Sequence, residues 1–179
     1  MDRVRTLTLV LLSALLLTAC RSDAPSTAEP TNEPEEQAAP ELDLSDPRQL
    51  GSAAAALYGR YKAEVEEILG QQLSGDEMAQ RLDALFHSYV PQMIELGRRC
   101  QELTEEGACQ TAIGALSMQA ATNFQWFGST AVGLRESNRA LSTQLNSMGA
   151  LFQWFNLEAA ARNFPELAER YSVSVPAPD

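Results

Sequence analysis

Apolar side chains recur at every third or fourth position over most of the chain from residue 47 onward. This spacing places them on one face of an α-helix, and no alternating pattern typical of strands competes with it. Four such stripes follow one another along the chain. We therefore expect an all-α fold, an antiparallel four-helix bundle with a kinked second helix and a short C-terminal helix. The stripes run from Leu50 to Ile68, from Met78 to Leu103, from Cys109 to Leu134 and from Leu141 to Ala159.

Capping residues mark where the predicted helices begin and end. Asp46 is a suitable N-cap for the first helix, with Pro47 at the first helical position and Gln49 placed to close a capping box. Ser74 and Glu77 have the spacing of a second capping box. The predicted stops are Gly70, Gly107 and Pro165, the last of which either ends the fourth helix or begins the short final one.

Pro91 lies within the second predicted helix and is the reason to expect a kink there. A proline cannot bond the carbonyl four residues earlier, which here belongs to His87, the single histidine of the chain. A kink beside this histidine could line a pocket. A surface histidine next to an ordinary proline kink is the simpler interpretation.

The first nineteen residues have the order of features found in secretory signal peptides. Arg3 and Arg5 precede an apolar run, from residue 7 to 17, that is too short to span a bilayer. The run ends in Leu17-Thr18-Ala19-Cys20, which resembles the lipobox of bacterial lipoproteins. An ordinary signal peptide, or a core helix, followed by a chance cysteine is the alternative.

The lipoprotein resemblance implies both an anchor and a location. It implies removal of residues 1–19 and acylation of Cys20, so that the chain is held at a membrane by lipid. In the lipoprotein sorting pattern, an aspartate directly after the lipidated cysteine favours the inner membrane. Arg21 and Ser22 stand there instead. We therefore expect the periplasmic face of the outer membrane.

Residues 20–46 have the composition of a tether. They contain eight acidic residues, one basic residue, four prolines and no aromatic residue. Such a segment cannot bury enough apolar surface to offset the entropy lost on ordering. We expect a disordered acidic spacer over 20–46, a helical domain over 47–172 and a tail over 173–179.

The overall charge bears on partners. The chain has 24 acidic and 13 basic residues, for a net charge of −11. A protein that binds nucleic acid without sequence preference needs a basic face to replace phosphate counterions, so we expect no nucleic-acid partner.

Cys100 and Cys109 lie on either side of the predicted turn between the second and third helices. In an oxidising periplasm this pair favours a structural disulfide, with two free thiols or a redox pair as alternatives. His87 is about three helical turns from Cys100, so we expect no metal site and no cofactor. The sequence shows no base paired with a nucleophile and no glycine-rich phosphate loop, and we expect no enzyme.

The second half of the bundle is unusually poor in charge. Residues 107–134 contain no charged residue, and residues 140–157 contain none either. The tetrapeptide Phe-Gln-Trp-Phe occurs in each of these two stretches. In both copies the phenylalanines fit the core stripe, whereas Trp126 and Trp154 are predicted to point away from it at about 100° per residue. The fourth helix has further apolar residues on the side of its tryptophan: Ala150, Leu157 and Ala161.

Three explanations for this second apolar side remain open. The final segment, with Phe164, Leu167 and Tyr171, could fold over Trp154. The side could form a protein interface, by self-association or with a partner helix, because interface cores are depleted in charge and retain aromatic residues. It could also contact the membrane, although basic residues for lipid headgroups are few.

These patterns together favour a binding protein. We expect a lipid-anchored periplasmic accessory protein that uses its charge-poor second hairpin to contact an envelope protein or another copy of itself. The partner-binding residues predicted on this basis are Trp126, Trp154, Leu157, Ala150 and Ala161. The alternative is a carrier or sensor that holds a small hydrophobic ligand in the bundle interior, near Pro91 and the phenylalanine-rich centre.

Overall fold

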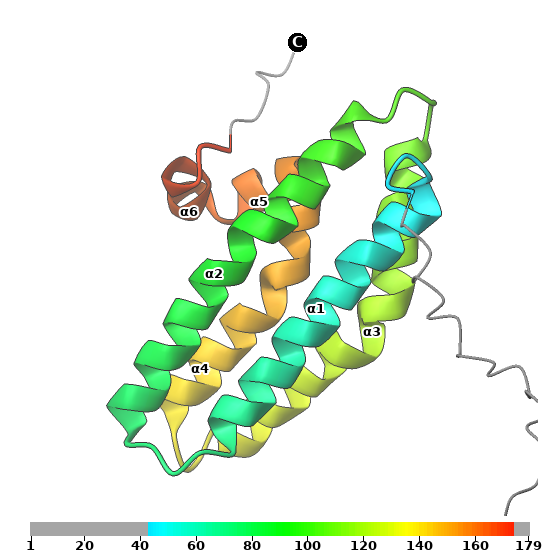
Figure 1. The fold of residues 1–179 in the computed structure, drawn as a ribbon. Coiled ribbons are helices and arrows are strands. Elements are labelled where there is room, and N and C mark those ends of the chain that lie inside the picture. Colours follow the sequence, from blue (N-terminus) through cyan, green and yellow to red (C-terminus); the bar gives the residue numbers. More distant parts are fainter. Residues whose placement is uncertain (1–42, 174–179) are drawn as a thin grey trace, which may run out of the picture. The chain divides into compact units, whose positions relative to one another are not determined.

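The chain is helical over nearly all of residues 43–173, which are the residues that our computed structural model describes (Figure 1). This part of the chain contains no strand, and the predicted all-α fold is confirmed. The predicted signal peptide, Cys20, most of the predicted tether and most of the tail lie outside it. The helices are α1 (Pro47–Leu69), α2 (Gly75–Glu102), α3 (Ala108–Leu134), α4 (Arg139–Met148), the 3-10 helix η1 (Gly149–Phe155), α5 (Leu157–Asn163) and α6 (Pro165–Arg170).

The first two helices begin at the predicted caps. The Asp46 carboxylate accepts hydrogen bonds from the two backbone amides at the start of α1, at 2.7 and 2.9 Å. Gln49 does not complete the predicted box on Asp46, because its side chain accepts from the amide of Asp43 instead. The box at α2 is complete, with the Glu77 amide donating to the Ser74 hydroxyl and the Ser74 amide donating to the Glu77 carboxylate.

Helix α2 ends earlier than predicted but continues through its proline. Its last helical residue is Glu102, five residues before the stop expected at Gly107. Gly107 has a φ of 77°, a left-handed conformation that glycine adopts without strain, and it directly precedes α3. Pro91 lies inside α2 without interrupting the helix.

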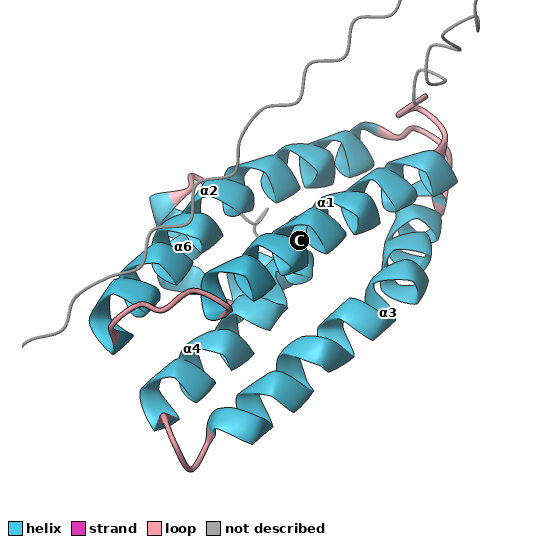
Figure 2. Ribbon diagram, turned by 60° about the horizontal axis from the view of Figure 1, so that its bottom comes forward, coloured by secondary structure: helices cyan, strands magenta, loops and turns pink. Residues whose placement is uncertain are grey.

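Consecutive long helices run antiparallel, as predicted, but their order around the bundle differs from their order in the chain. Helix α1 packs against both α2 and α3, while α4 and η1 pack against α2 and α3 (Figures 1 and 2). The helices therefore follow one another around the bundle as α1, α2, α4–η1 and α3. In this arrangement α1 and α3 are parallel neighbours, and α2 and α3 are close mainly where the chain connects them.

Small residues explain the close pairing of α1 with α3. A Cβ atom added to Gly51 of α1 would lie 2.3 Å from the backbone oxygen of Ala112 and 2.8 Å from the Cβ of Ala115, both in α3. No larger residue at position 51 fits this backbone separation. The cluster of alanine and glycine near the start of α1 thus brings the two helix backbones together.

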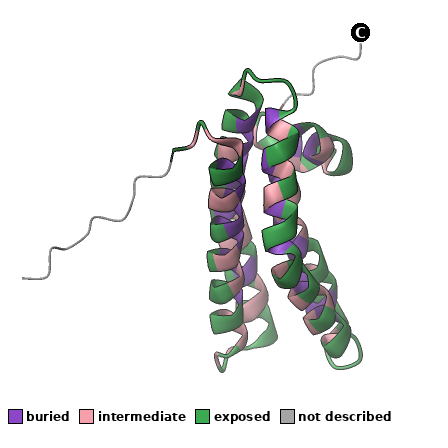
Figure 3. Ribbon diagram, turned by 90° about the vertical axis from the view of Figure 1, so that its right-hand side faces the viewer, coloured by how far each residue is buried: buried purple, intermediate pink, exposed green. Residues whose placement is uncertain are grey.

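An aromatic cluster occupies the middle of the bundle, where buried residues of different helices face one another (Figure 3). Tyr58 and Tyr61 of α1 are fully buried and lie 5.8 and 5.6 Å, between ring centroids, from Phe127 of α3. Burial raises the pKa of both tyrosines above its ordinary value. Tyr89 of α2 lies 5.2 Å from Tyr61, and its hydroxyl donates to the carboxylate of Glu64. Burial and this hydrogen bond raise the pKa of Tyr89 to about 12.

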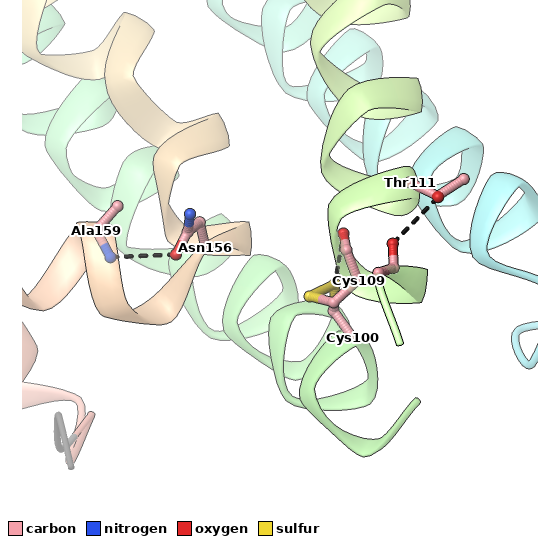
Figure 4. The surroundings of a disulfide bond; sticks show 6 residues. Cys100, Cys109, Thr111, Asn156 and Ala159 are labelled. Carbon is pink, nitrogen blue, oxygen red and sulfur yellow. Dashed lines mark hydrogen bonds between the residues drawn. A yellow bond between two sulfur atoms is a disulfide. The ribbon is translucent and has the colours of Figure 1, made fainter. Parts of the chain in front are cut away.

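The predicted fourth helix is not continuous, which corrects the sequence-based interpretation. It changes from α4 to the 3-10 helix η1 at Gly149, where an added Cβ would lie 2.9 Å from the Cβ of Phe127. The Tyr58 hydroxyl donates to the Gly149 carbonyl at 2.7 Å. After η1, Asn156 caps α5 by accepting from the amide of Ala159 at 3.1 Å (Figure 4). The chain therefore changes direction within the stretch that the apolar spacing predicted as one helix.

Candidate docking surface on helix α3

Trp154 is in the core, so the prediction that it binds a partner is wrong. Its side chain is 1% exposed. The ring of Phe164 stacks on it at 5.7 Å, and the ring of Tyr171 meets it edge-on at 5.9 Å. The 3-10 geometry of η1 and the turn after it rotate Trp154 inward, and the final segment folds over it. This was the first of the three explanations for the second apolar side, and it is confirmed for Trp154.

Two further residues predicted to bind a partner are also buried. Leu157 and Ala161 of α5 are 6% and 9% exposed. Helix α5 packs against α2, where a Cβ added to Gly97 would lie 3.0 Å from a methyl group of Leu157 and 2.6 Å from the backbone oxygen of Phe155. The prediction that Leu157 and Ala161 form a docking surface is therefore wrong. The break in the fourth helix turns both side chains into the core.

Trp126 is half-buried and already has partners. Its ring contacts Phe127 edge-on at 5.0 Å, and the ammonium group of Lys62 lies 4.9 Å from the ring centroid. A cation over an indole ring is attracted by the ring quadrupole. Lys62 also pairs with Glu66 at 2.6 Å. Trp126 therefore links α3 to α1 and is not a free docking group.

The exposed large apolar side chains of the described chain are on α3, two of them on its outer side and the third, Phe124, beside Phe152 of η1. Met118 is 82% exposed, Val132 is 63% exposed and Phe124 is 49% exposed. These three are the exposed large hydrophobic residues of the described chain, and all of them belong to one helix. The sequence pattern placed Phe124 in the core stripe with Phe127, and this prediction is wrong for Phe124. Only Phe127 turns inward, at 1% exposure.

A regular stripe runs along this outer side. Its members alternate at spacings of four and three residues, the heptad spacing that keeps side chains on one face of a helix. Five of them are exposed and the sixth, Gly128, is half-buried. None is charged. We call this set the outer stripe; it consists of Gly114, Met118, Ala121, Gln125, Gly128 and Val132.

The outer stripe is flanked by charges of opposite sign. Glu105 and Glu106 precede α3, and Arg135 and Arg139 follow it, together with Glu136. All five are exposed, and within residues 43–173 none of them forms an ion pair. The surface therefore has an acidic end, a neutral centre and a basic end.

The predicted disulfide between Cys100 and Cys109 is present and holds the start of α3. The two Cα atoms are 4.9 Å apart, and Cys100 is fully buried (Figure 4). The bond joins the last turns of α2 to the first turn of α3. Close to it, the Thr111 hydroxyl donates to the Gly107 carbonyl at 3.1 Å. The N-terminal end of the outer stripe is thus covalently fixed to the rest of the bundle.

A separate cleft lies between α2, α4, η1 and the C-terminal segment. Its volume is about 320 Å³. At its edge, Nδ1 of His87 is 2.5 Å from the Tyr171 hydroxyl, and the Arg170 guanidinium donates to Nε2 at 3.2 Å. His87 therefore connects α2 to the C-terminal segment and is not the surface residue favoured by the sequence. Residues lining the cleft include Phe86, Met148, Ala150, Trp154, Phe164 and Leu167.

Ala150 is the one predicted partner-binding residue that lines this cleft, where it is half-buried. Among residues 43–173, no group of three or more His, Cys, Asp or Glu side chains could hold a metal ion. Over the same residues, no helix has both the length and the apolar character needed to cross a bilayer.

Comparison of the chain with known protein families, with curated proteins and with solved structures finds no match. The feature that sequence reasoning missed is the outer stripe. Its signal in the sequence is the charge-free run over residues 107–134, but helical spacing alone does not tell which side of that run faces water.

Proposed function

We propose that this protein is a lipid-anchored accessory protein of the bacterial envelope that binds another protein through the outer stripe of α3. One observation carries the proposal: the exposed large hydrophobic residues of the described chain, Met118, Phe124 and Val132, all lie on a helix without a single charged residue. A helix that faces only water normally has charged residues on its outer face.

The composition of the surface suits a buried contact. Interface cores are depleted in charged residues, because each charge must be desolvated when the partner binds. Removing a large apolar side chain from water contributes about 1.5–3 kcal/mol. Met118 and Val132, the more exposed of the three, would therefore supply much of the binding free energy. The small residues between them leave the α3 backbone accessible to close approach by another helix.

The N-terminal segment supports the envelope location. A signal peptide over 1–19, acylation at Cys20 and an acidic tether over 20–46 would hold the bundle near the periplasmic face of the outer membrane. Confinement close to a membrane raises the effective concentration for partners held in the same layer. A modest binding surface is then sufficient for function.

Site-specific photo-crosslinking tests the docking surface. A photoreactive amino acid is placed at Met118 or Val132 of the full chain in its native membranes. The same amino acid at Gln92, an exposed position on α2, is the control. We expect one discrete crosslinked protein from both α3 positions and none from Gln92. Crosslinks of equal yield from all three positions, or none from α3, would refute the proposal.

The cleft beside His87 favours a second candidate function, the binding of a small apolar ligand. Its volume of about 320 Å³ is at the lower end of the range of about 300–1,000 Å³ found for ligand pockets, and its lining is largely apolar. The test is native mass spectrometry of the full chain extracted under mild conditions, with Ala150→Trp as the variant that fills the cleft. A bound small molecule in the native protein and its loss in the variant would support this function. Ligand-free protein in both cases would argue against it.

A further inference from the structure

We infer that the partner of the outer stripe is a second copy of this chain, with the two α3 helices packed antiparallel about a two-fold axis that passes between Ala121 and Gln125. The inference rests on the proposed function, because it requires the outer stripe to be a docking surface. It deepens that function by naming the occupant. Two independent features of α3, the order of side-chain sizes and the sign of the flanking charges, fit this arrangement.

The order of sizes along the outer stripe is self-complementary. Large and small residues alternate: each small residue is followed four positions later by a large one, and Met118 and Gln125 are followed three positions later by a small one. When a second α3 is laid antiparallel, with the two-fold axis at the level of residue 123, every large side chain of one outer stripe faces a small residue of the other. Protruding side chains then fit the gaps of the facing helix. The resulting pairs are Met118 with Gly128, Gln125 with Ala121, and Val132 with Gly114.

A parallel, in-register pair lacks this fit. Each residue would then face itself, so that Met118 would meet Met118 and Gly128 would meet Gly128. The helices would be held apart at the large residues and would leave gaps at the small ones. Voids and overpacking both weaken an interface, and the antiparallel arrangement avoids both.

The flanking charges are complementary in the same register. Antiparallel packing brings the acidic end of one α3, with Glu105 and Glu106, to the basic end of the other, where Arg135 and Arg139 outnumber Glu136. These side chains are exposed and form no ion pair within the described part of the chain, so they are free to pair across the axis. The neutral centre adds no like-charge repulsion, although the chain has a net charge of −11. Opposite charges at an interface fix its register.

The inferred interface is short. The outer stripe extends over nineteen residues, from 114 to 132, which is about 27 Å at a rise of 1.5 Å per residue. A contact made mainly by one such helix pair is smaller than the roughly 1,200–2,000 Å² that stable complexes bury. The dimer in solution is therefore expected to depend on concentration, and confinement at a membrane would favour it.

Gln125 provides the first test. In the inferred dimer the two copies of Gln125 are offset by only four residues along the helix axis, about 6 Å. Two glutamates introduced there would therefore be close together in a desolvated contact. We would measure the dimerisation of the full chain in mild detergent by sedimentation velocity over a range of concentrations. The variants are Gln125→Glu and, as a matched control, Gln92→Glu on the exposed side of α2. We expect the Kd of the dimer to rise about tenfold or more for Gln125→Glu and to stay unchanged for the control.

Spin-label distances test the orientation. Cysteines for labelling replace the exposed residues Thr122, Ser129 and Thr111, one per variant, at the edge of the outer stripe. In the antiparallel arrangement the two labels of a dimer are offset along the helix axis by about 3, 18 and 36 Å, respectively, at 1.5 Å per residue. A parallel pair would give one short distance at all three positions. The chain without an added cysteine is the background.

The outcomes separate this inference from the proposed function. A native chain that stays monomeric, a dimer unaffected by Gln125→Glu, or equal distances at the three labels would each overturn the antiparallel dimer. If the crosslinks from Met118 and Val132 then lead to a different protein, the docking function stands and only its occupant changes. If α3 gives no crosslinks and no dimer forms, both proposals fail.

Discussion

Replacing Trp154 by alanine tests whether the end of the chain is part of the core. The side chain is 1% exposed and lies between the bundle and the C-terminal segment, in contact with Phe164 and Tyr171. Its removal deletes the group on which both rings pack. The segment would then be held by the packing of α6 on α5, by the buried Ala168 and by the hydrogen bonds of His87.

The expected loss of stability is large. Truncating a fully buried tryptophan to alanine costs about 3–5 kcal/mol, as lost transfer free energy and as an unfilled cavity. A domain of this size has a total stability of about 5–15 kcal/mol, so the variant would retain only part of it. Trp126 is the matched comparison within the same chain, because it is half-buried and on the surface of α3. For Trp126→Ala we expect a loss of about 1–2 kcal/mol, since less apolar surface returns to water.

Urea denaturation followed by far-ultraviolet circular dichroism measures both variants. We expect the midpoint of Trp154→Ala to fall well below that of Trp126→Ala, and chymotrypsin to cleave the former after Tyr171 under native conditions. A Trp154→Ala protein within about 1 kcal/mol of the native stability would contradict the burial argument. It would also reopen the possibility that this residue serves a partner.

Three further perturbations test other parts of the fold. Gly51→Ala should destabilise the bundle by about 1–3 kcal/mol, because its Cβ would overlap the α3 backbone. Gly133→Ala, with open space around it, should stabilise α3 by up to about 1 kcal/mol. Thermal melts of both variants measure the two changes in stability. Reducing the Cys100–Cys109 disulfide should cost about 2–3 kcal/mol, measured as the difference in unfolding free energy with and without reductant. The raised pKa of Tyr89, about 12, means that the folded state binds this proton more tightly than the unfolded state. The contribution of Tyr89 to the free energy of unfolding should therefore be complete below pH 10 and should be lost as the pH rises from about 10 to 12. Loss of helix and ionisation of tyrosine should then occur together.

The boundaries of the early helices were predictable because their causes are local. The carboxylate of Asp46 and the Ser74–Glu77 box act on amides within three residues of themselves. The disulfide was predictable for a similar reason, since Cys100 and Cys109 are separated by only a short turn. Such features depend on neighbours in the chain and need no knowledge of how the helices pack.

The break in the fourth helix could not be predicted in this way. Gly149 is visible in the sequence, but its effect depends on the side chain of Phe127 and on the Tyr58 hydroxyl, which come from other helices. The apolar spacing from residue 141 to 159 fits a continuous helix, and in such a helix Trp154 points away from the core stripe. The actual path turns Trp154 inward.

The candidate docking surface also has one feature that the sequence predicts and another that only the packing of the helices decides. The absence of charge over residues 107–134 was evident from the chain alone, and it correctly marked α3 as unusual. Which of its apolar residues face water was settled by the packing of α1, α4 and η1 against α3. That packing buries Phe127 and leaves Met118 and Val132 exposed. Helical periodicity identifies residues that share a face, but only the positions of the neighbouring helices establish which face is covered.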